Sequence, residues 1–487
     1  MEMTNTVPGW YKVFGDESTG DTPQERAATS LVRFVRSQDE LGIYNSSSTG
    51  RCFTAKEALL HFGSERLKQV FYDGSALLPP KPDEPAKTLR ERREELGITQ
   101  TDLAGFVGLK VDAIAKAESP DYTNSIHDLT RLAMVLSLDD ATIGFQPGAN
   151  GDQAIAVRLK AWRRTGATAR TIASLSEITW VIATQQRLQR ILTPYSKPLT
   201  GFVPNDYYGD AYNPVWKVAS ELAIETRRLL GISPNEPIES LRKLCRTLEV
   251  PLVHAQLTQT IAGATLATGD VRGIVVNVSG NDKNVWVQRA TVAHELGHLL
   301  WDPAERLQAL VVDERSQVEE IKRERQDVQN WSTQERQHWL NEARANAFAV
   351  ELLAPQEAIR ERTRTLDFSD YENIADAIRD NMEWFGLSAT AMRYHLWNTF
   401  DRAFDLERVL SYLDLTPTDD WKGMESFTDD IFVFRETPIS RRGYFAGLVA
   451  KAEQEGWLSE QAAAIYLNTD LSEYTKGRGE VIALYAA

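Results

Sequence analysis

The sequence predicts a multidomain, mainly α-helical protein with one α+β core, in which a small sheet accompanies a helix that carries a His-Glu-x-x-His pattern. Three observations support this fold class. The chain has 487 residues, more than an ordinary single domain contains. Apolar residues recur at helical spacing through most of the chain. Short apolar runs separated by turn residues, as in strands, gather in the segment 250–278.

Bulk composition places the chain among ordinary globular proteins. It is 42% hydrophobic and 25% charged. The net charge of -15 disfavours non-specific attraction to nucleic acid, which needs clustered Lys and Arg. No run of about eighteen apolar residues predicts a membrane span, and Met1 to Asp16 lacks the pattern of a secretory signal. Only two cysteines, Cys52 and Cys245, are present, which fits a reducing compartment, so we expect a cytoplasmic protein without a membrane partner.

Breaker-rich segments suggest where domains begin and end. Leu78 to Pro85 contains four prolines, which disfavour helices and strand ladders. Residues 141–150 form a second breaker-rich segment. We therefore predict five parts: an N-terminal region of unassigned role (1–77), a short-helix domain (86–145), a helical connector (151–212), the α+β core (213–358) and a helical C-terminal domain (359–487).

Periodicity and capping residues predict the individual elements. Thr99 is a good N-cap, and Gly97 and Gly108 are suited to ending helices. The strands 263–267 and 273–278 flank a Thr268-Gly269-Asp270 turn and predict a hairpin. Another strand is expected at 250–255. Helices are expected near 25–36, 55–70, 89–96, 100–107, 111–118, 125–136, 151–195, 215–230, 238–248, from 286 onward, at 340–353 and through most of the C-terminal part.

The pattern His294-Glu295-Leu296-Gly297-His298 is typical of a zinc site. Residues four apart lie one turn apart on one helix face, so two imidazoles can meet one tetrahedral ion. Glu295 is then placed to accept a proton from a metal-activated water, and such water has a pKa near 7 instead of 15.7. Gly297 lowers helix propensity, so we expect another group to pack closely against it.

A catalytic zinc needs a third protein ligand and an open position. Ala304 occupies the place where a third histidine would follow at metzincin-like spacing. A carboxylate on a packed helix is held more rigidly than one in the charged segment 305–337. This argument favours the helix 340–353, which offers Glu342 and Glu351, and leaves both open.

Several separated motifs resemble the ImmA/IrrE family of metallopeptidases, over about 215–358. The resemblance implies a zincin-like metallopeptidase core with one catalytic Zn²⁺, with His294, His298 and Glu342 as ligands and Glu295 as general base. The chain departs from the family in a long insertion before the ligand helix and in Ala354, where the family often has Met. The motifs, in the family's order, are Ile261 to Thr265, Ile274 to Asn277, Thr291 to His298, Glu342 to Ala349 and Leu352 to Pro355.

Proteolysis is the reaction that these residues predict. His338 lies one helical turn before Glu342 and is a candidate donor to a developing oxyanion, although an exposed histidine in a charged segment is the commoner case. The strands before the metal helix could pair with an extended peptide. The family resemblance implies a protein substrate, such as a helix-turn-helix repressor in a stress or mobile-element (defence) response.

Residues 86–140 resemble the phage-repressor-like (xenobiotic-response-element) helix-turn-helix family. The resemblance implies DNA contacts by Gln100, Lys110 and Lys116. The segment has seven Lys/Arg against ten Asp/Glu, and Asp112 would meet bases or phosphates with the wrong charge. A protein-binding or dimerising role, with a homodimer as one outcome, therefore stays open. The matching residues are Leu89, Leu96 to Gln100, Leu103, Ala104, Gly108, Leu109, Ile114, Glu118, Leu129, Leu132, Ala133 and Leu136.

Three functional hypotheses follow from these motifs. The first is a zinc-dependent regulatory endopeptidase that cleaves a partner protein. The second is a DNA-binding transcriptional regulator whose peptidase-like part senses a ligand or binds a partner. In the third, the chain's own helix-turn-helix mimics a substrate and holds the cleft until a signal arrives.

Overall fold

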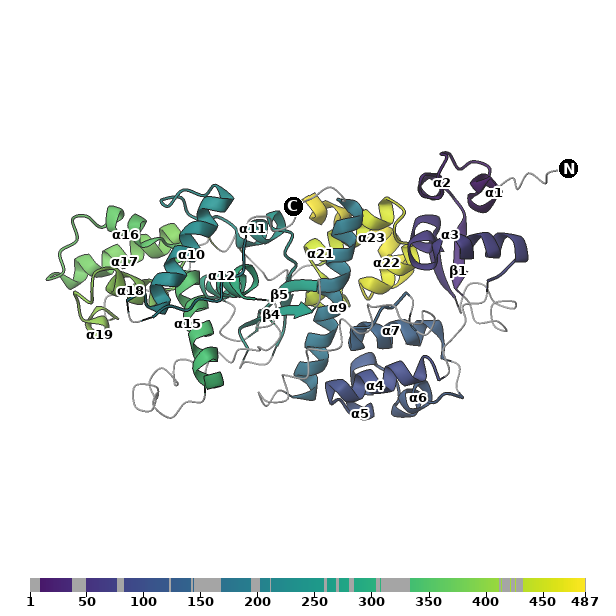
Figure 1. Cartoon of the computed structure of the whole chain (residues 1–487), viewed down its shortest axis with the longest axis horizontal. Coiled ribbons are helices and arrows are strands. Elements are labelled where there is room, and N and C mark those ends of the chain that lie inside the picture. The colour runs from purple at the N-terminus through teal and green to yellow at the C-terminus, as the bar shows by residue number, and fades with distance from the viewer. Residues whose placement is uncertain are drawn as a thin grey trace. The chain divides into compact units, whose positions relative to one another are not determined.

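The structure is a computed structural model in which the described residues are mainly helical, as predicted, and include two small sheets, of which the sequence predicted the one in the α+β core (Figure 1). None of the helices in the described part of the chain is long and apolar enough to cross a bilayer. The structure describes residues 9–36, 50–76, 83–121, 124–141, 143, 168–193, 202–210, 212–257, 261–268, 271–279, 284–303, 307, 333–410, 413, 421, 425 and 432–486.

The chain divides into two compact units. Unit 1 combines Met1–Tyr195 with Asp429–Ala487, and unit 2 is Ser196–Thr428. Each unit thus contains part of the segment 359–487, which the sequence predicts as one C-terminal domain. The proline-rich segment 78–85 lies mostly outside the described residues.

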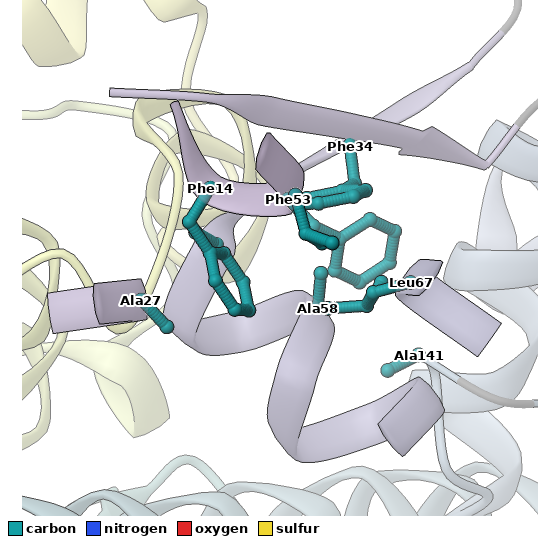
Figure 2. Packing of buried hydrophobic residues seen from close by; sticks show 9 residues of the cluster. Phe14, Ala27, Phe34, Phe53, Ala58, Leu67 and Ala141 are labelled. Atoms are coloured by element: carbon teal, nitrogen blue, oxygen red, sulfur yellow. The ribbon is translucent and has the colours of Figure 1, made fainter. Parts of the chain in front are cut away.

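Unit 1 begins with a small α/β substructure. A capping box between Thr22 and Glu25 starts the second helix, which ends at Thr29 because Ser30 is extended. The predicted helix near 25–36 is therefore wrong in its second half, where a strand pairs antiparallel with a second strand. Phe14, Phe34 and Phe53 meet in the core between these elements (Figure 2). The elements are α1 (Trp10–Phe14), α2 (Pro23–Thr29), β1 (Arg33–Arg36), β2 (Arg51–Thr54) and α3 (Ala55–Asp73).

Four short helices follow at 86–136. The Thr99 side chain accepts a hydrogen bond from the N–H of Asp102, whose carboxylate accepts one from the backbone N–H of Thr99, as a capping box requires. Gly97 and Gly108 end their helices with φ of 68° and 67°, a left-handed conformation that glycine adopts without strain. The helices are α4 (Ala86–Leu96), α5 (Gln100–Val107), α6 (Val111–Ala117) and α7 (Ile126–Leu136).

A long, largely buried helix, α9 (Ala169–Leu192), contacts both α7 and a C-terminal helix, α21. It is thus packed on more than one side. The helix expected at 151–195 is described only from residue 168 to residue 193, and its first part, 151–167, lies outside the described residues. Gly447 lets α21 approach the last helix closely, since a Cβ there would lie 2.4 Å from the backbone nitrogen of Tyr485. The C-terminal elements of unit 1 are the 3-10 helix η5 (Ile439–Arg441), α21 (Tyr444–Gln454), α22 (Glu460–Tyr466) and α23 (Leu471–Ala486).

Unit 2 contains the predicted α+β core. Its three strands have the order β3-β5-β4, with β3 (Leu252–Ala255) parallel to β5 (Val271–Asn277) and β4 (Gly263–Thr268) antiparallel to it. The expected hairpin, formed by β4 and β5, is confirmed. Helix α12 (Val285–Trp301) packs on β4 and β5.

Helix α15 (Thr333–Leu353) contacts both α12 and α10 (Val215–Leu230), which brings two chemistry-bearing helices together (Figure 1). It begins seven residues before the predicted start at residue 340. The other helices of unit 2 are α11 (Leu241–Thr247), α16 (Gln356–Arg362), α17 (Tyr371–Phe385), α18 (Ala389–Thr399) and α19 (Leu406–Val409).

Candidate metal centre

Helix α12 presents two histidines one turn apart. The Asn284 side chain caps its start by accepting from the N–H of Trp286. Arg289, fully buried, forms an ion pair with Glu425 and anchors the helix within unit 2. Because His294 and His298 are four residues apart, they lie on one face of the helix. Their Nε2 atoms are 3.1 Å apart.

Glu342, on α15, meets both imidazoles. Its carboxylate oxygens lie 3.3 Å from Nε2 of His294 and 3.5 Å from Nε2 of His298. One possible ligand atom from each of the three residues lies within 4.8 Å of the others, and all three residues are buried. The buried His294, His298 and Glu342 could therefore hold a metal ion. Glu351, the other carboxylate that the residue pattern left open, instead lies 3.9 Å from His395.

The outward ring nitrogens are also held. Nδ1 of His294 lies 2.9 Å from Oδ1 of Asn346, and Nδ1 of His298 lies 2.8 Å from Oδ2 of Asp302. Because these oxygens accept hydrogen bonds, each Nδ1 carries the proton and each Nε2 can present a lone pair to a shared ion. Two imidazole nitrogens and a carboxylate are ligands that zinc accepts in catalytic sites. The residues present therefore fit zinc.

Asp302 is itself fixed by further partners. Arg344 donates to its Oδ1, and the Asn341 amide donates to its Oδ2 at 2.8 Å. The Tyr208 hydroxyl donates to Asn341 at 2.7 Å. The sequence pattern predicted neither Asp302 nor Asn346 as a partner of the two histidines. The four-residue spacing from His298 to Asp302 was the available signal, because such residues meet on a helix face.

Charge at the site favours a cation. Burial lowers the pKa of His298, but the carboxylates of Glu342 and Asp302 outweigh burial and hold that pKa well above its ordinary value. Burial raises the pKa of Glu342, yet the two imidazoles outweigh this and keep it well below its ordinary range. The two imidazoles thus bind protons in the absence of an ion while Glu342 stays ionised, and a metal would compete with the imidazole protons.

Glu295 is oriented from the sheet. The Thr265 hydroxyl, on β4, lies 2.7 Å from Oε2 of Glu295 and 3.1 Å from its carbonyl oxygen. Gly263, on the same strand, leaves room for α12, because a Cβ there would lie 2.5 Å from Cγ2 of Thr291. Thr265 belongs to the motif Ile261 to Thr265, but the spacing of that motif did not predict its contact with Glu295.

The expected close approach at Gly297 is confirmed. A Cβ at this position would lie 2.7 Å from Cδ1 of Phe348, on α15. The glycine therefore sets how closely the two ligand-bearing helices approach. His338 lies within α15, but its side chain is outside the described residues.

The three predicted DNA-contacting residues lie in unit 1. The Gln100 amide donates to Glu118 at 2.9 Å. Lys116 pairs with Asp112 at 2.8 Å. Lys110, exposed at the N-cap of α6, makes no side-chain capping bond there. Two of the three side chains are thus engaged within the domain.

Comparison with known proteins adds no assignment. No protein-family model matches the chain, and no curated protein matches it. Among the described residues, His294, His298 and Glu342 form the only cluster of three or more possible metal ligands.

Proposed function

We propose that this protein is a zinc-dependent regulatory endopeptidase with a zincin-like core of the ImmA/IrrE type. One observation carries the proposal: His294, His298 and Glu342 converge from two helices, with Glu295 beside them on the first. Two histidines, a carboxylate and an adjacent glutamate make up a known kind of peptidase site.

The chain's own residues would perform defined tasks. His294, His298 and Glu342 would hold one zinc ion, which when bound acts as a Lewis acid toward water and a peptide carbonyl. Glu295 would take the proton of the attacking water and pass it to the leaving amine. The Thr265 hydroxyl, 2.7 Å from Oε2, orients that carboxylate. His338 stays a candidate oxyanion donor.

Burial of the centre supports regulation. The exposed fractions of His294, Glu295, His298 and Glu342 are 3%, 3%, 5% and 5%. Residues Gly263 to Ala267 of the edge strand β4, the expected docking strand for an extended peptide, are also buried. A polypeptide substrate therefore needs the site to open, which suits a peptidase that acts on a signal.

The motif resemblance supplies the proposed substrate class. A protein with a helix-turn-helix domain, such as a repressor in a stress or mobile-element response, is the substrate that we propose. Its extended segment would provide backbone groups for pairing with β4.

The test compares the parent chain with Glu295→Gln. We expect both to bind one zinc per chain, because the substitution leaves the three ligands in place, and only the parent to cleave cellular proteins. Zinc would be measured by elemental analysis and cleavage by proteomic mapping of new termini. Glu357→Gln, which removes an exposed carboxylate on α16, is the matched control and should cleave normally. Equal cleavage by Glu295→Gln and the parent would contradict the mechanism.

A DNA-binding regulator is the second candidate. It is supported by α5 and α6, which Gly108, Leu109 and Lys110 connect as in a helix-turn-helix. Binding in this case should be sequence-specific, fall with salt, and weaken in Lys110→Ala. Electrophoretic mobility shift with DNA from around the protein's own gene tests this function. Absence of retardation at low salt would argue against it.

A further inference from the structure

Helix α15 also borders a cavity on its other side. The cavity measures about 520 Å³ and is lined by α10, α15, the start of α16, α18 and the segment that follows α18, a size common for small-molecule sites. Glu351 lines it and lies nine residues after Glu342. Nine residues are two and a half helical turns, so these two glutamates project from opposite faces of α15. The cavity is therefore separate from the candidate metal centre.

Glu351 has an unsatisfied oxygen. The side chain is 3% exposed. Its Oε1 accepts from the N–H of Gln356 at 3.1 Å, and the Ser220 hydroxyl is a further polar neighbour of the carboxylate, while Oε2 has no partner at hydrogen-bond geometry among the described residues. His395 comes within 3.9 Å of Oε2, but its Nε2 lies 2.6 Å from the carbonyl of Ala354 and donates there. A buried carboxylate oxygen without a donor costs free energy that a ligand N–H can recover.

The positive charge near that carboxylate does not offset its burial. Burial raises the pKa of Glu351 to about 7, against smaller opposing effects of Gln356, Ser220, Arg360 and Arg227. Burial lowers the pKa of His395 to about 4, so the neighbouring imidazole is neutral at pH 7. An added cation beside Glu351 would therefore be favoured electrostatically.

The remaining walls suit a cation with an apolar body. Trp216 and Tyr394 line the cavity and are 56% and 44% exposed, and aromatic faces attract cations. Asp401 adds a second carboxylate to the lining. Arg402, the lining residue that would favour an anion, has its guanidinium 4.9 Å from the centroid of the Trp397 ring.

We propose that this cavity binds a small organic cation, a primary amine or guanidine, whose N–H groups donate to Glu351 and whose apolar part packs on Trp216 and Tyr394. The site is independent of the proposed peptidase activity. It gives the protein a means of recognising a metabolite-sized ligand away from the metal centre.

Calorimetric titration of the full chain tests the site with tryptamine and agmatine as probes. We expect saturable binding of at least one amine. Glu351→Gln should weaken that binding about tenfold to a hundredfold, because it removes a charge-assisted hydrogen bond. Glu357→Gln, with its exposed carboxylate outside the cavity lining, should bind as the parent does.

Two further arms keep the proposal open to refutation. Trp216→Ala alters an exposed side chain, so it should leave the fold intact and weaken tryptamine binding. Tryptophol and indole-3-acetate, the neutral and anionic counterparts of tryptamine, should bind at least tenfold more weakly. Lack of saturable binding by both amines, undiminished binding to Glu351→Gln, or equal binding of indole-3-acetate would overturn the proposal.

Discussion

At the scale of single residues, the candidate centre depends on side chains that would not touch the metal. Nδ1 of His294 is hydrogen-bonded to the side-chain oxygen of Asn346, and Nδ1 of His298 to a carboxylate oxygen of Asp302. These contacts set which ring nitrogen carries the proton and which way each ring faces. Asp302 also accepts from Arg344, so one carboxylate links a candidate metal-binding histidine to a buried guanidinium. The histidines are thus oriented before any ion binds.

Asp302→Asn tests this orientation. The substitution removes the negative charge beside His298 and leaves Arg344 without its buried counter-charge, so zinc affinity should fall about tenfold to a hundredfold. Competition with a chromogenic chelator measures the affinity. Asp376→Asn breaks a surface pair with Arg379 and should leave zinc binding unchanged. Parent-like affinity in Asp302→Asn would show that Asp302 does not tune the site.

At the scale of elements, the close contact of α12 with α15 determines whether the ligands meet. Gly297 faces the Phe348 ring, and Glu342 and Asn346 both lie on α15. A shift of α15 relative to α12 would therefore move Glu342, a candidate ligand, together with Asn346, the hydrogen-bond partner of His294. The packing of α12 against α15 therefore sets the distances between the candidate ligands.

Gly297→Ala should disturb this contact. Its Cβ would lie 2.7 Å from Cδ1 of Phe348, so the free energy of unfolding should fall by about 1–3 kcal/mol despite the better helix propensity of alanine. Gly105→Ala is the matched control, since a Cβ at Gly105, within helix α5, meets nothing within 4 Å. It should raise stability by up to about 1 kcal/mol. Urea denaturation compares the two, and a stabilised Gly297→Ala would contradict the close packing.

Local chemistry explains why most helix ends were predictable. Capping residues and left-handed glycines act within a few positions of each other, as at Thr99 and Gly108. The failure near 25–36 has a physical reason as well. Arg33 to Arg36 pairs with Arg51 to Thr54, and a strand formed by a distant partner overrides local helical spacing.

At the scale of the whole molecule, unit 1 is assembled from the two ends of the chain. Asp140 accepts from Arg51 and, at 3.1 Å, from Trp180. The Tyr466 hydroxyl donates to Asp140 at 3.0 Å and accepts from Arg187 at 2.8 Å. This buried polar network joins β2, the end of the helix-turn-helix segment, α9 and α22. Deletion of 1–150, the direct test of an inhibitory helix-turn-helix, would remove two of its members and disturb unit 1 as a whole.

Tyr466→Phe should weaken unit 1 alone. It leaves the Asp140 carboxylate and the guanidinium groups of Arg51 and Arg187 each without one partner, which should cost about 1–3 kcal/mol. Zinc affinity should stay unchanged, because the three proposed ligands belong to unit 2. Chemical denaturation measures the loss of stability, and a separate zinc titration measures the affinity. Tyr72→Phe, at a position 54% exposed, should be neutral; an equal loss in both variants would remove the role of the network.

The sequence by itself determined the mainly helical class, the hairpin, most helix ends, and two histidines and a glutamate on one helix, because these depend on spacing and on neighbours within a few residues. Residue spacing left Glu342 and Glu351 both open and the family resemblance implied Glu342; the tertiary structure brings Glu342 to His294 and His298. Only the tertiary structure divided the segment 359–487 between two units. Asp140 and Tyr466, a hydrogen-bonded pair, are 326 positions apart. Such contacts arise from the packing of segments that are far apart in the sequence, which no local pattern encodes.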